Sequence, residues 1–460
     1  MTSRRRRTTV VLAVLIALVS GGAAVALTQA DGSAEDASPS PAVGVLSPRR
    51  APEAFRDLIA DTRLASRVGA FMRSVSSTSC AELRADDSPI LAVHAEQLLM
   101  PASSLKLTTA AAFLATAGGR SRFTTRVWYP RKDASGTVAF LALEGSGDPL
   151  LATQGYVDTR THPPKPFTDF TQLAATLHAA GITRVTGGIE VVDSAYDNER
   201  RVPSWSAGYT AGGDVGPLGA LAVNDGFSSY APLVAAPDPG MAAANELRAE
   251  LQGLGVAVEG ATTRGNRPAA PIEDVSVESA PYADVVTEML TESDNNTAEL
   301  LLKELSRRGG DHPATRSAGV AARAAALRTL GIDPKQVQAI DGSGLDRSDR
   351  ATCDALLDTL TSRPGGYDLG TMLSVAGQTG TLDDRFLDSP LKGTLRAKTG
   401  TLDGVTALVG VVDPKATTKL RFAFISNGNF TEAGGRALQD RLVAALATYP
   451  EAPPTDTLAP

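Results

Sequence analysis

The most informative stretch of the chain is Met100-Pro101-Ala102-Ser103-Ser104-Leu105-Lys106. A proline at its front, helix-forming residues behind it and Gly118-Gly119 further on predict a buried helix of about four turns. Ser103 and Lys106 are three residues apart, which puts both side chains on one helix face. A serine needs an adjacent base to become a nucleophile, and a lysine with a lowered pKa can be that base. The alternative is a helix cap and a surface charge.

A second stretch, Ser293-Asp294-Asn295, joins two helical patterns, of which the second covers residues 297–305. Such a turn can present a hydroxyl and a carboxamide to a cleft. The alternative is again a helix cap, because serine, aspartate and asparagine are preferred at helix N-termini.

The third stretch is Lys398-Thr399-Gly400-Thr401, followed by two apolar runs at 405–412 and 420–426 with a turn at Pro414. These runs predict a hairpin. Gly400 would let a ligand approach the backbone closely, and an edge strand could pair with an extended peptide. The lysine and the two threonines would offer a cation and hydroxyl donors to a carboxylate. The similar segment 378–381 lacks the lysine. The segment 389–392 repeats the spacing of Ser103 and Lys106, but no apolar helix follows it.

The ordered set SxxK, SxN and KTG is far more specific than any one member, and it is the signature of penicillin-binding proteins and β-lactamases. The interval from Ser103 to Ser293 is much longer than in compact β-lactamases. It resembles the class C low-molecular-mass penicillin-binding proteins, the D-alanyl-D-alanine carboxypeptidase/endopeptidase family. The resemblance covers about residues 55–445 and includes further segments: Gly145–Pro149, Gly187–Ile189, Ala222–Asn224, Asp341–Leu345 with Arg347, and Gln378–Leu382.

This resemblance implies a role for each motif residue. Ser103 would be the nucleophile and Lys106 its general base, and Ser293 would relay a proton to the leaving D-alanine. Substrate binding would fall to Asn295, Lys398, Thr399, Gly400 and Thr401. Lys398 would also support Ser293 electrostatically, and its positive charge would help to keep Lys106 neutral. The backbone N–H groups of Ser103 and Thr401 would form the oxyanion hole.

The resemblance also implies the partners, which are peptidoglycan stem peptides and, as covalent inhibitors, β-lactam antibiotics. No cofactor is implied. A β-lactamase is one alternative, but the glutamates that follow Ser293, Glu299 and Glu304, lie in a helical pattern without a matching catalytic loop. The penicilloyl adduct should therefore be long-lived. A non-catalytic protein that binds or scaffolds wall peptides is the other alternative, and carboxypeptidase and endopeptidase action are not separated by the sequence.

The resemblance implies an α/β fold of the serine β-lactamase and penicillin-binding-protein type, with an antiparallel sheet flanked by helices. We expect a discontinuous catalytic domain formed by residues 51–122 and 276–449. Residues 123–275 contain short strand-like runs and Gly/Pro-rich turns, which predict one or two inserted β-rich domains.

The N-terminus predicts export. Arg4 to Arg7 precede an apolar run that extends to about Leu27, so residues 1–30 are expected to be a cleaved signal peptide or an uncleaved membrane anchor. A flexible linker should follow at 31–52, and residues 450–460 should form a disordered tail. The protein would then lie outside the cytoplasm, secreted to the cell wall or anchored in the cytoplasmic membrane. Export makes Cys80 and Cys353 candidates for a disulfide, with two buried thiols as the alternative.

Composition excludes two other classes of protein. The 460 residues carry 44 Lys and Arg against 51 Asp and Glu, and beyond residue 7 there is no basic run, so nucleic-acid binding is not expected. With two cysteines and four histidines, none in an HExxH pattern, a metal enzyme is not expected either.

Overall fold

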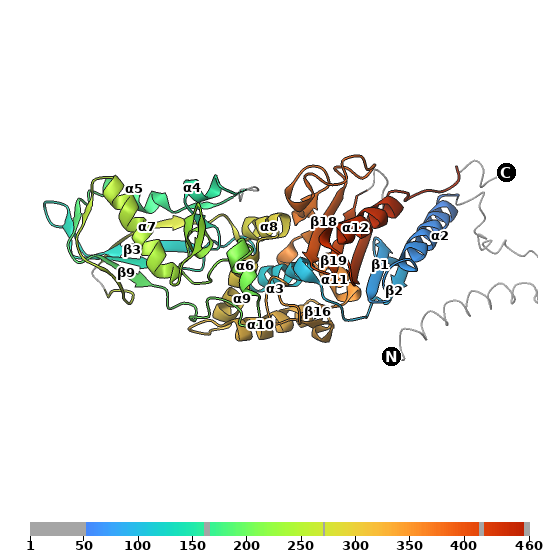
Figure 1. Cartoon of the computed structure of the whole chain (residues 1–460), viewed down its shortest axis with the longest axis horizontal. Coiled ribbons are helices and arrows are strands. Elements are labelled where there is room, and N and C mark those ends of the chain that lie inside the picture. The colour runs from blue at the N-terminus through green and yellow to red at the C-terminus, as the bar shows by residue number, and fades with distance from the viewer. Residues whose placement is uncertain (1–51, 161–165, 270–271, 414–417, 455–460) are drawn as a thin grey trace, which may run out of the picture.

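The computed structural model describes residues 52–160, 166–269, 272–413 and 418–454. The predicted export segment 1–30 lies outside these ranges, as do the linker before Pro52, the turn at Pro414 and the last residues of the tail. Within the described ranges, no helix combines the length and apolar character needed to span a bilayer. The molecule is elongated, with the inserted segment at one end and the two flanking segments together at the other (Figure 1).

A six-stranded antiparallel sheet lies at the centre of the second end. Its strand order is β17-β18-β19-β20-β1-β2, so segments from both ends of the chain share it. The predicted hairpin is present, because β19 and β20 pair along their whole length. The strands are β1 (Ser79–Ala85), β2 (Ser88–Val93), β17 (Ser374–Val375), β18 (Leu395–Leu402), β19 (Val405–Val412) and β20 (Leu420–Asn427).

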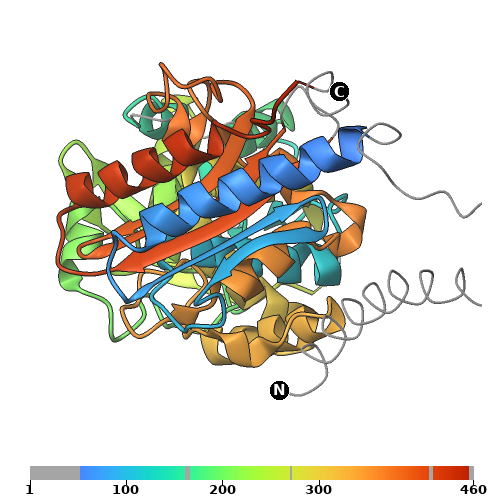
Figure 2. The same ribbon diagram turned by 90° about the vertical axis from the view of Figure 1, so that its right-hand side faces the viewer.

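Helices cover both faces of this sheet. On one face, α2 (Pro52–Met72) and α12 (Glu432–Leu446) lie side by side (Figure 2). Successive side chains of a strand point to opposite faces. Leu408 of β19 therefore packs with α2 and α12, whereas Ala407 and Val409 pack with the helices of the other face. Those helices are α3 (Lys106–Ala117), α8 (Tyr282–Glu292), α9 (Asn295–Arg308) and α11 (Cys353–Thr361). Burial on both faces explains why these strands are apolar without alternation.

The inserted segment is built on a five-stranded mixed sheet with the order β13-β9-β5-β3-β14. Its core also includes two helices, α5 (Thr171–Ala179) and α7 (Pro239–Gly253). The strands are β3 (Thr124–Tyr129), β5 (Leu141–Glu144), β9 (Ile189–Val192), β13 (Thr262–Arg264) and β14 (Glu273–Glu278). Because β14 pairs with β3 along its length, this sheet extends past residue 275, where the sequence placed the end of the insert.

Smaller elements complete the two ends of the molecule. In the insert these are β4 (Thr137–Val138), β6 (Leu151–Ala152), α4 (Gln154–Val157), β7 (Thr168–Asp169), β8 (Arg184–Val185), α6 (Ala207–Gly212), β10 (Phe227–Tyr230), β11 (Leu233–Ala235) and β12 (Ala257–Val258). The insert also contains the 3₁₀ turn η3 (Asn224–Gly226). Elsewhere the smaller elements are α10 (Arg316–Thr329), β15 (Val337–Gln338), β16 (Arg350–Ala351) and the 3₁₀ turns η2 (Ala102–Leu105), η4 (Pro334–Gln336), η5 (Pro364–Gly366), η6 (Leu369–Met372) and η7 (Gly380–Leu382).

The insert also packs directly against helix α9. Tyr196, Val202 and Trp205 of the insert share a buried cluster with Leu300 of α9. Asn295 is the first residue of this helix, so the insert is fixed against an element that carries a predicted site residue.

Candidate active site

Ser103 and Lys106 meet in a geometry different from the predicted one. Instead of a continuous α-helix, the chain makes the 3₁₀ turn η2 from Ala102 to Leu105, and α3 begins at Lys106. Side chains three residues apart eclipse one another in a 3₁₀ turn, which brings these two closer than an α-helix would. The Lys106 Nζ lies 2.9 Å from the Ser103 Oγ. Ala102, just before the serine, has a left-handed backbone with φ of 46°.

Lys106 is fully buried, and its ammonium group is surrounded by neutral oxygens. Besides Ser103, it contacts the Asn295 Oδ1 at 2.7 Å and the Ser343 carbonyl at 2.9 Å. Burial lowers the pKa of Lys106 to about 8, although nearby carboxylates oppose the shift. A general base works best when its pKa lies near the working pH, so Lys106 is suited to take the serine proton.

The Ser293-Asp294-Asn295 turn has both of the functions that its sequence suggested, divided among its residues. Asp294 caps α9, because its carboxylate accepts a 2.6 Å hydrogen bond from the Thr297 N–H. Ser293 ends α8 in a left-handed conformation with φ of 64°. Asn295 contacts Lys106 through its oxygen and donates through Nδ2 to the Asp214 carbonyl at 2.7 Å.

Lys398 lies in β18 and is also fully buried. Its Nζ donates to the Ser293 Oγ at 2.8 Å and to the Thr399 carbonyl at 2.9 Å. Burial, followed by the positive charge of Lys106, lowers the pKa of Lys398 well below its usual range. The neighbouring charge thus acts on Lys398, whereas burial is what lowers the pKa of Lys106. Lys398 is not among the residues that line the cleft, and its predicted part in substrate binding stays a prediction.

Gly400 makes room for the turn that carries the nucleophile, and the prediction that it also lets a ligand approach the backbone stays a prediction. A Cβ at this position would lie 2.7 Å from the Pro101 carbonyl oxygen and 3.1 Å from the Ser104 N. The glycine therefore allows β18 to run directly beside η2. On its other side, β18 pairs with β17 only at Arg396 and Ala397. Beyond Ala397, that edge has no partner among the described strands, which leaves it free to pair with a peptide.

A cleft of about 400 Å³ opens where these segments meet. Of the predicted residues, Ser103, Ser293, Asn295, Thr399 and Thr401 line it, while Lys106, Lys398 and Gly400 lie in the layer beneath. Other residues complete the lining: Tyr209, Asp214, Leu345, Thr381, Arg385, Leu402, Glu432 and Arg436. The Thr399 hydroxyl donates to the Thr381 hydroxyl at 3.0 Å, so the glycine-threonine turn at 378–381 forms one wall.

The loop from Asp341 to Leu345 was singled out in the sequence without a role, and the structure gives it one. Its Ser343 carbonyl accepts the hydrogen bond from Lys106. The Glu299 Oε1 accepts from the backbone N–H groups of Gly342 and Ser343 at 2.9 and 2.8 Å, which fixes the loop. Every residue has a backbone carbonyl, so the sequence alone could not predict that the one of Ser343 contacts Lys106.

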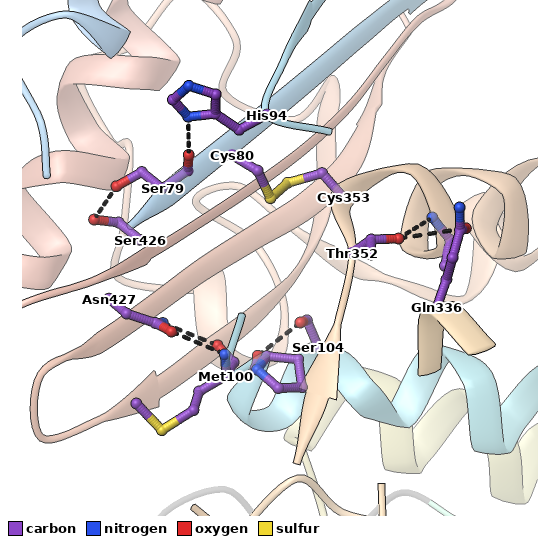
Figure 3. Close-up of a disulfide and its surroundings, with 12 residues drawn as sticks. Ser79, Cys80, His94, Met100, Ser104, Gln336, Thr352, Cys353, Ser426 and Asn427 are labelled. Atoms are coloured by element: carbon purple, nitrogen blue, oxygen red, sulfur yellow. Dashed lines mark hydrogen bonds between the residues drawn. A yellow bond between two sulfur atoms is a disulfide. The ribbon is translucent and has the colours of Figure 1, made fainter. Parts of the chain in front are cut away.

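Asn427, at the end of β20, holds the chain just before the nucleophile. Its Oδ1 accepts from the Met100 N–H at 2.8 Å and its Nδ2 donates to the Met100 carbonyl at 3.1 Å (Figure 3). The same view shows the Cys80–Cys353 disulfide, which joins β1 to the start of α11. The pairing that the sequence left open is thus a bond between two fully buried residues.

A helix-covered antiparallel sheet on which SxxK, SxN and KTG segments share one cleft defines a serine hydrolase of the penicillin-binding class. The model of the D-Ala-D-Ala carboxypeptidase 3 (S13) family matches residues 70–231 and 228–449. The chain belongs to this family, as the sequence resemblance predicted.

Characterised relatives and solved structures agree with this assignment. A carboxypeptidase of Mycobacterium tuberculosis is 33% identical over 362 residues, which cover 76% of this chain and 75% of that protein. The D-alanyl-D-alanine carboxypeptidase of Actinomadura sp. is 28% identical and covers 77% and 78%. The fold is shared with penicillin-binding protein 4 of Haemophilus influenzae, with a TM-score of 0.68 at 21% identity over 82% of this chain and 98% of that one.

Proposed function

We propose that this protein hydrolyses the terminal D-alanyl-D-alanine bond of peptidoglycan stem peptides through an acyl-enzyme on Ser103. The observation that carries the proposal is the position of Lys106, fully buried and 2.9 Å from the serine hydroxyl. With a pKa of about 8, part of this lysine is neutral near pH 7 and can accept a proton.

In the first half-reaction, Lys106 takes the Ser103 proton while the serine oxygen bonds to the substrate carbonyl carbon. Backbone N–H groups of Ser103 and Thr401 stabilise the oxyanion, a contribution of about 3 kcal/mol per donor in related chemistry. The C–N bond then breaks, and Ser293, held by Lys398, relays the proton taken up by Lys106 to the leaving D-alanine amine, so that Lys106 is neutral again and Ser293 keeps its own proton. Water releases the acyl group and restores the serine. Asn295 binds the substrate amide, and the Thr399 and Thr401 hydroxyls bind the terminal carboxylate.

We propose that β-lactams acylate the same serine and that the adduct is long-lived. Among the similar solved structures, one is of the Haemophilus protein with a β-lactam and another is of a penicillin-G-acylated endopeptidase of Bdellovibrio bacteriovorus. In this chain the glutamates that could serve deacylation are engaged elsewhere. Glu299 binds the loop at Gly342, and Glu304 binds Arg307 and Arg308.

The test is release of free D-alanine from a pentapeptide, with cleavage of cross-linked dimers as the second substrate. Ser103→Ala should abolish both D-alanine release and labelling by fluorescent penicillin. Ser389→Ala is the matched control, because Ser389 also stands three residues before a lysine but lies outside the cleft. An adduct that persists in Ser103→Ala would refute the nucleophile. Binding of stem peptide without acylation would instead identify a non-catalytic protein, and rapid cephalosporin turnover a β-lactamase.

We also propose that the protein works outside the cytoplasmic membrane. The support is the sequence of residues 1–30, whose arginines and apolar run are typical of an export segment. Mass spectrometry of the N-terminus in membrane and culture-fluid fractions would distinguish a cleaved signal from an anchor. A chain confined to the cytosol would contradict the proposal.

A further inference from the structure

A second pocket, of about 310 Å³, adjoins the Ser293-Asp294-Asn295 turn. Asp294 lines this pocket, whereas Ser293 and Asn295 on either side of it line the catalytic cleft. The pocket lies between α8 and the part of the insert around α4 and η3, and four carboxylates face it: Asp225, Glu288, Glu292 and Asp294. Arg160 is the one basic residue in the lining among the described residues.

Arg160 offsets part of the negative charge at Asp225 and Glu288, but Glu288 keeps an unsatisfied polar atom. Tyr156 donates a 2.6 Å hydrogen bond to Asp225, and the Arg160 guanidinium lies 5.5 Å from the centre of the Tyr156 ring. Glu288 is 96% buried, yet its Oε2 has no hydrogen-bond partner among the described residues. A buried polar atom without a partner is costly, and a buried charge even more so. The pocket is thus short of a hydrogen-bond donor at Glu288.

Burial of these carboxyl groups also changes their pKa values. Burial, followed by the charge of Asp294, raises the pKa of Asp225 to about 7 and that of Glu288 well above its usual range. A cation entering the pocket would favour the ionised forms. Its binding would therefore release protons near neutral pH.

The lining indicates the chemistry of such a cation. Among the described residues, no group of three acidic, histidine or cysteine side chains is arranged to hold a metal ion. Pro149, Leu150, Leu151 and Ala152 also line the pocket and give it apolar surface. A primary ammonium supplies three donors, and an alkyl stem matches an apolar surface. We propose that this pocket binds a primary alkylammonium group and that its occupancy adjusts the Ser293–Asn295 turn of the catalytic cleft.

Asn296 links the catalytic turn to the pocket, because it follows Asn295 of the cleft and hydrogen-bonds to the backbone of Asp225. The Asn296 side chain accepts from the Gly216 N–H at 2.8 Å and donates to the Asp225 carbonyl at 3.3 Å. Asp225 and its neighbour Asn224 both have φ of 56°, a conformation that non-glycine residues adopt only when their surroundings hold them. A ligand bound by Asp225 and Asp294 would therefore act on both residues that flank the Asn296 hydrogen bond: Asp225, whose carbonyl accepts it, and Asp294 in the catalytic turn.

Binding is tested by calorimetry of the full chain with pentylamine, with pentanol as the neutral control. Nα-acetyl-lysine amide distinguishes a peptide-borne amine from a free one. We expect one site for at least one of the two amines and none for pentanol. Because protons are released, the observed heat should vary linearly with the ionisation enthalpy of the buffer. Glu288→Gln should weaken binding at least tenfold. The matched control is Glu246→Gln, which removes a half-buried carboxylate outside this pocket.

Glu288→Gln is expected to fold, because it replaces a carboxyl whose Oε2 has no hydrogen-bond partner by a group of the same shape. Thermal unfolding of each variant checks this, and Asp225→Asn provides a second substitution in the pocket. Absence of heat with both amines, or equal binding by Glu288→Gln and the wild type, would overturn the proposal.

The effect on catalysis rests on the proposed function, so it has its own readout. Saturating amine should change the rate of penicillin acylation about fivefold, as is usual for coupled sites, and the change should disappear in Glu288→Gln. Amine binding with no acylation in any condition would refute the proposed function but not the pocket. Acylation that is insensitive to a bound amine would refute the coupling.

Discussion

Lys106 and Lys303 are equally buried, but their surroundings are opposite in kind. Lys106 contacts a hydroxyl, a carboxamide oxygen and a backbone carbonyl. Lys303, in the second half of α9, forms an ion pair with the Asp197 carboxylate and contacts the Glu199 carbonyl. Lys106 is therefore placed to exchange a proton with a serine hydroxyl, whereas Lys303 is held in an ion pair. Burial alone therefore does not identify a base; the chemistry of the neighbours does.

The sharpest test of this comparison removes each lysine in turn. Lys106→Ala should reduce penicillin acylation by about 10³-fold or more, because the serine loses its base. Lys303→Met should leave the acylation rate unchanged and lower the free energy of unfolding by about 2 kcal/mol, since Asp197 is left unpaired but partly exposed. Stopped-flow labelling and urea unfolding measure the two effects. Equal loss of acylation in both variants would mean that Lys106 does not differ from Lys303 in its role in acylation.

The shape of the cleft should also depend on the close approach of β18 to the turn η2 at Gly400. Gly400→Ala would place a methyl group 2.7 Å from the Pro101 carbonyl, and backbone cannot yield as a flexible side chain does. We expect a loss of about 1–3 kcal/mol in stability and a clear fall in acylation.

Gly253→Ala is the control for this substitution, because nothing lies within 4 Å of a Cβ at that position near the end of α7. It should be neutral or stabilise by a few tenths to about 1 kcal/mol. If both alanine variants acylate at the wild-type rate, β18 and η2 do not require their close approach.

A smaller effect is expected at Asn427, which contacts the nucleophile's segment only through Met100. Asn427→Ala leaves a backbone N–H and a carbonyl without their partner and should cost about 1–2 kcal/mol. Asn427→Asp keeps the acceptor but loses the donor, so its free energy of unfolding should lie between those of the wild type and Asn427→Ala. Unfolding curves of the three proteins give the order, and an alanine variant as stable as the wild type would show that Met100 is held by other contacts.

The sequence predicted the residue types of the candidate site better than it predicted their backbone conformation. Ser103, Ser293 and the threonines of β18 are identified by residue type and order, and the apolar runs predicted the β19–β20 hairpin. The 3₁₀ turn under Ser103 was missed because helix-forming residues favour both helix types.

Other features were missed because they depend on contacts between distant segments. The part that Gly400 plays depends on a carbonyl far away in the sequence, and the Ser343 contact uses a backbone atom. The extension of the insert's sheet to β14 likewise follows from pairing with β3, which no local pattern shows.

The pH dependence of penicillin acylation tests the central claim most directly. Lys106 must be neutral to accept the serine proton, and its neutral fraction rises with pH through a pKa of about 8. The acylation rate should therefore rise with pH and reach half of its maximum near pH 8, in the wild type and equally in Lys303→Met. A rate that does not change between pH 6 and 9, or whose midpoint lies near the 10.5 of an ordinary lysine, would contradict the account.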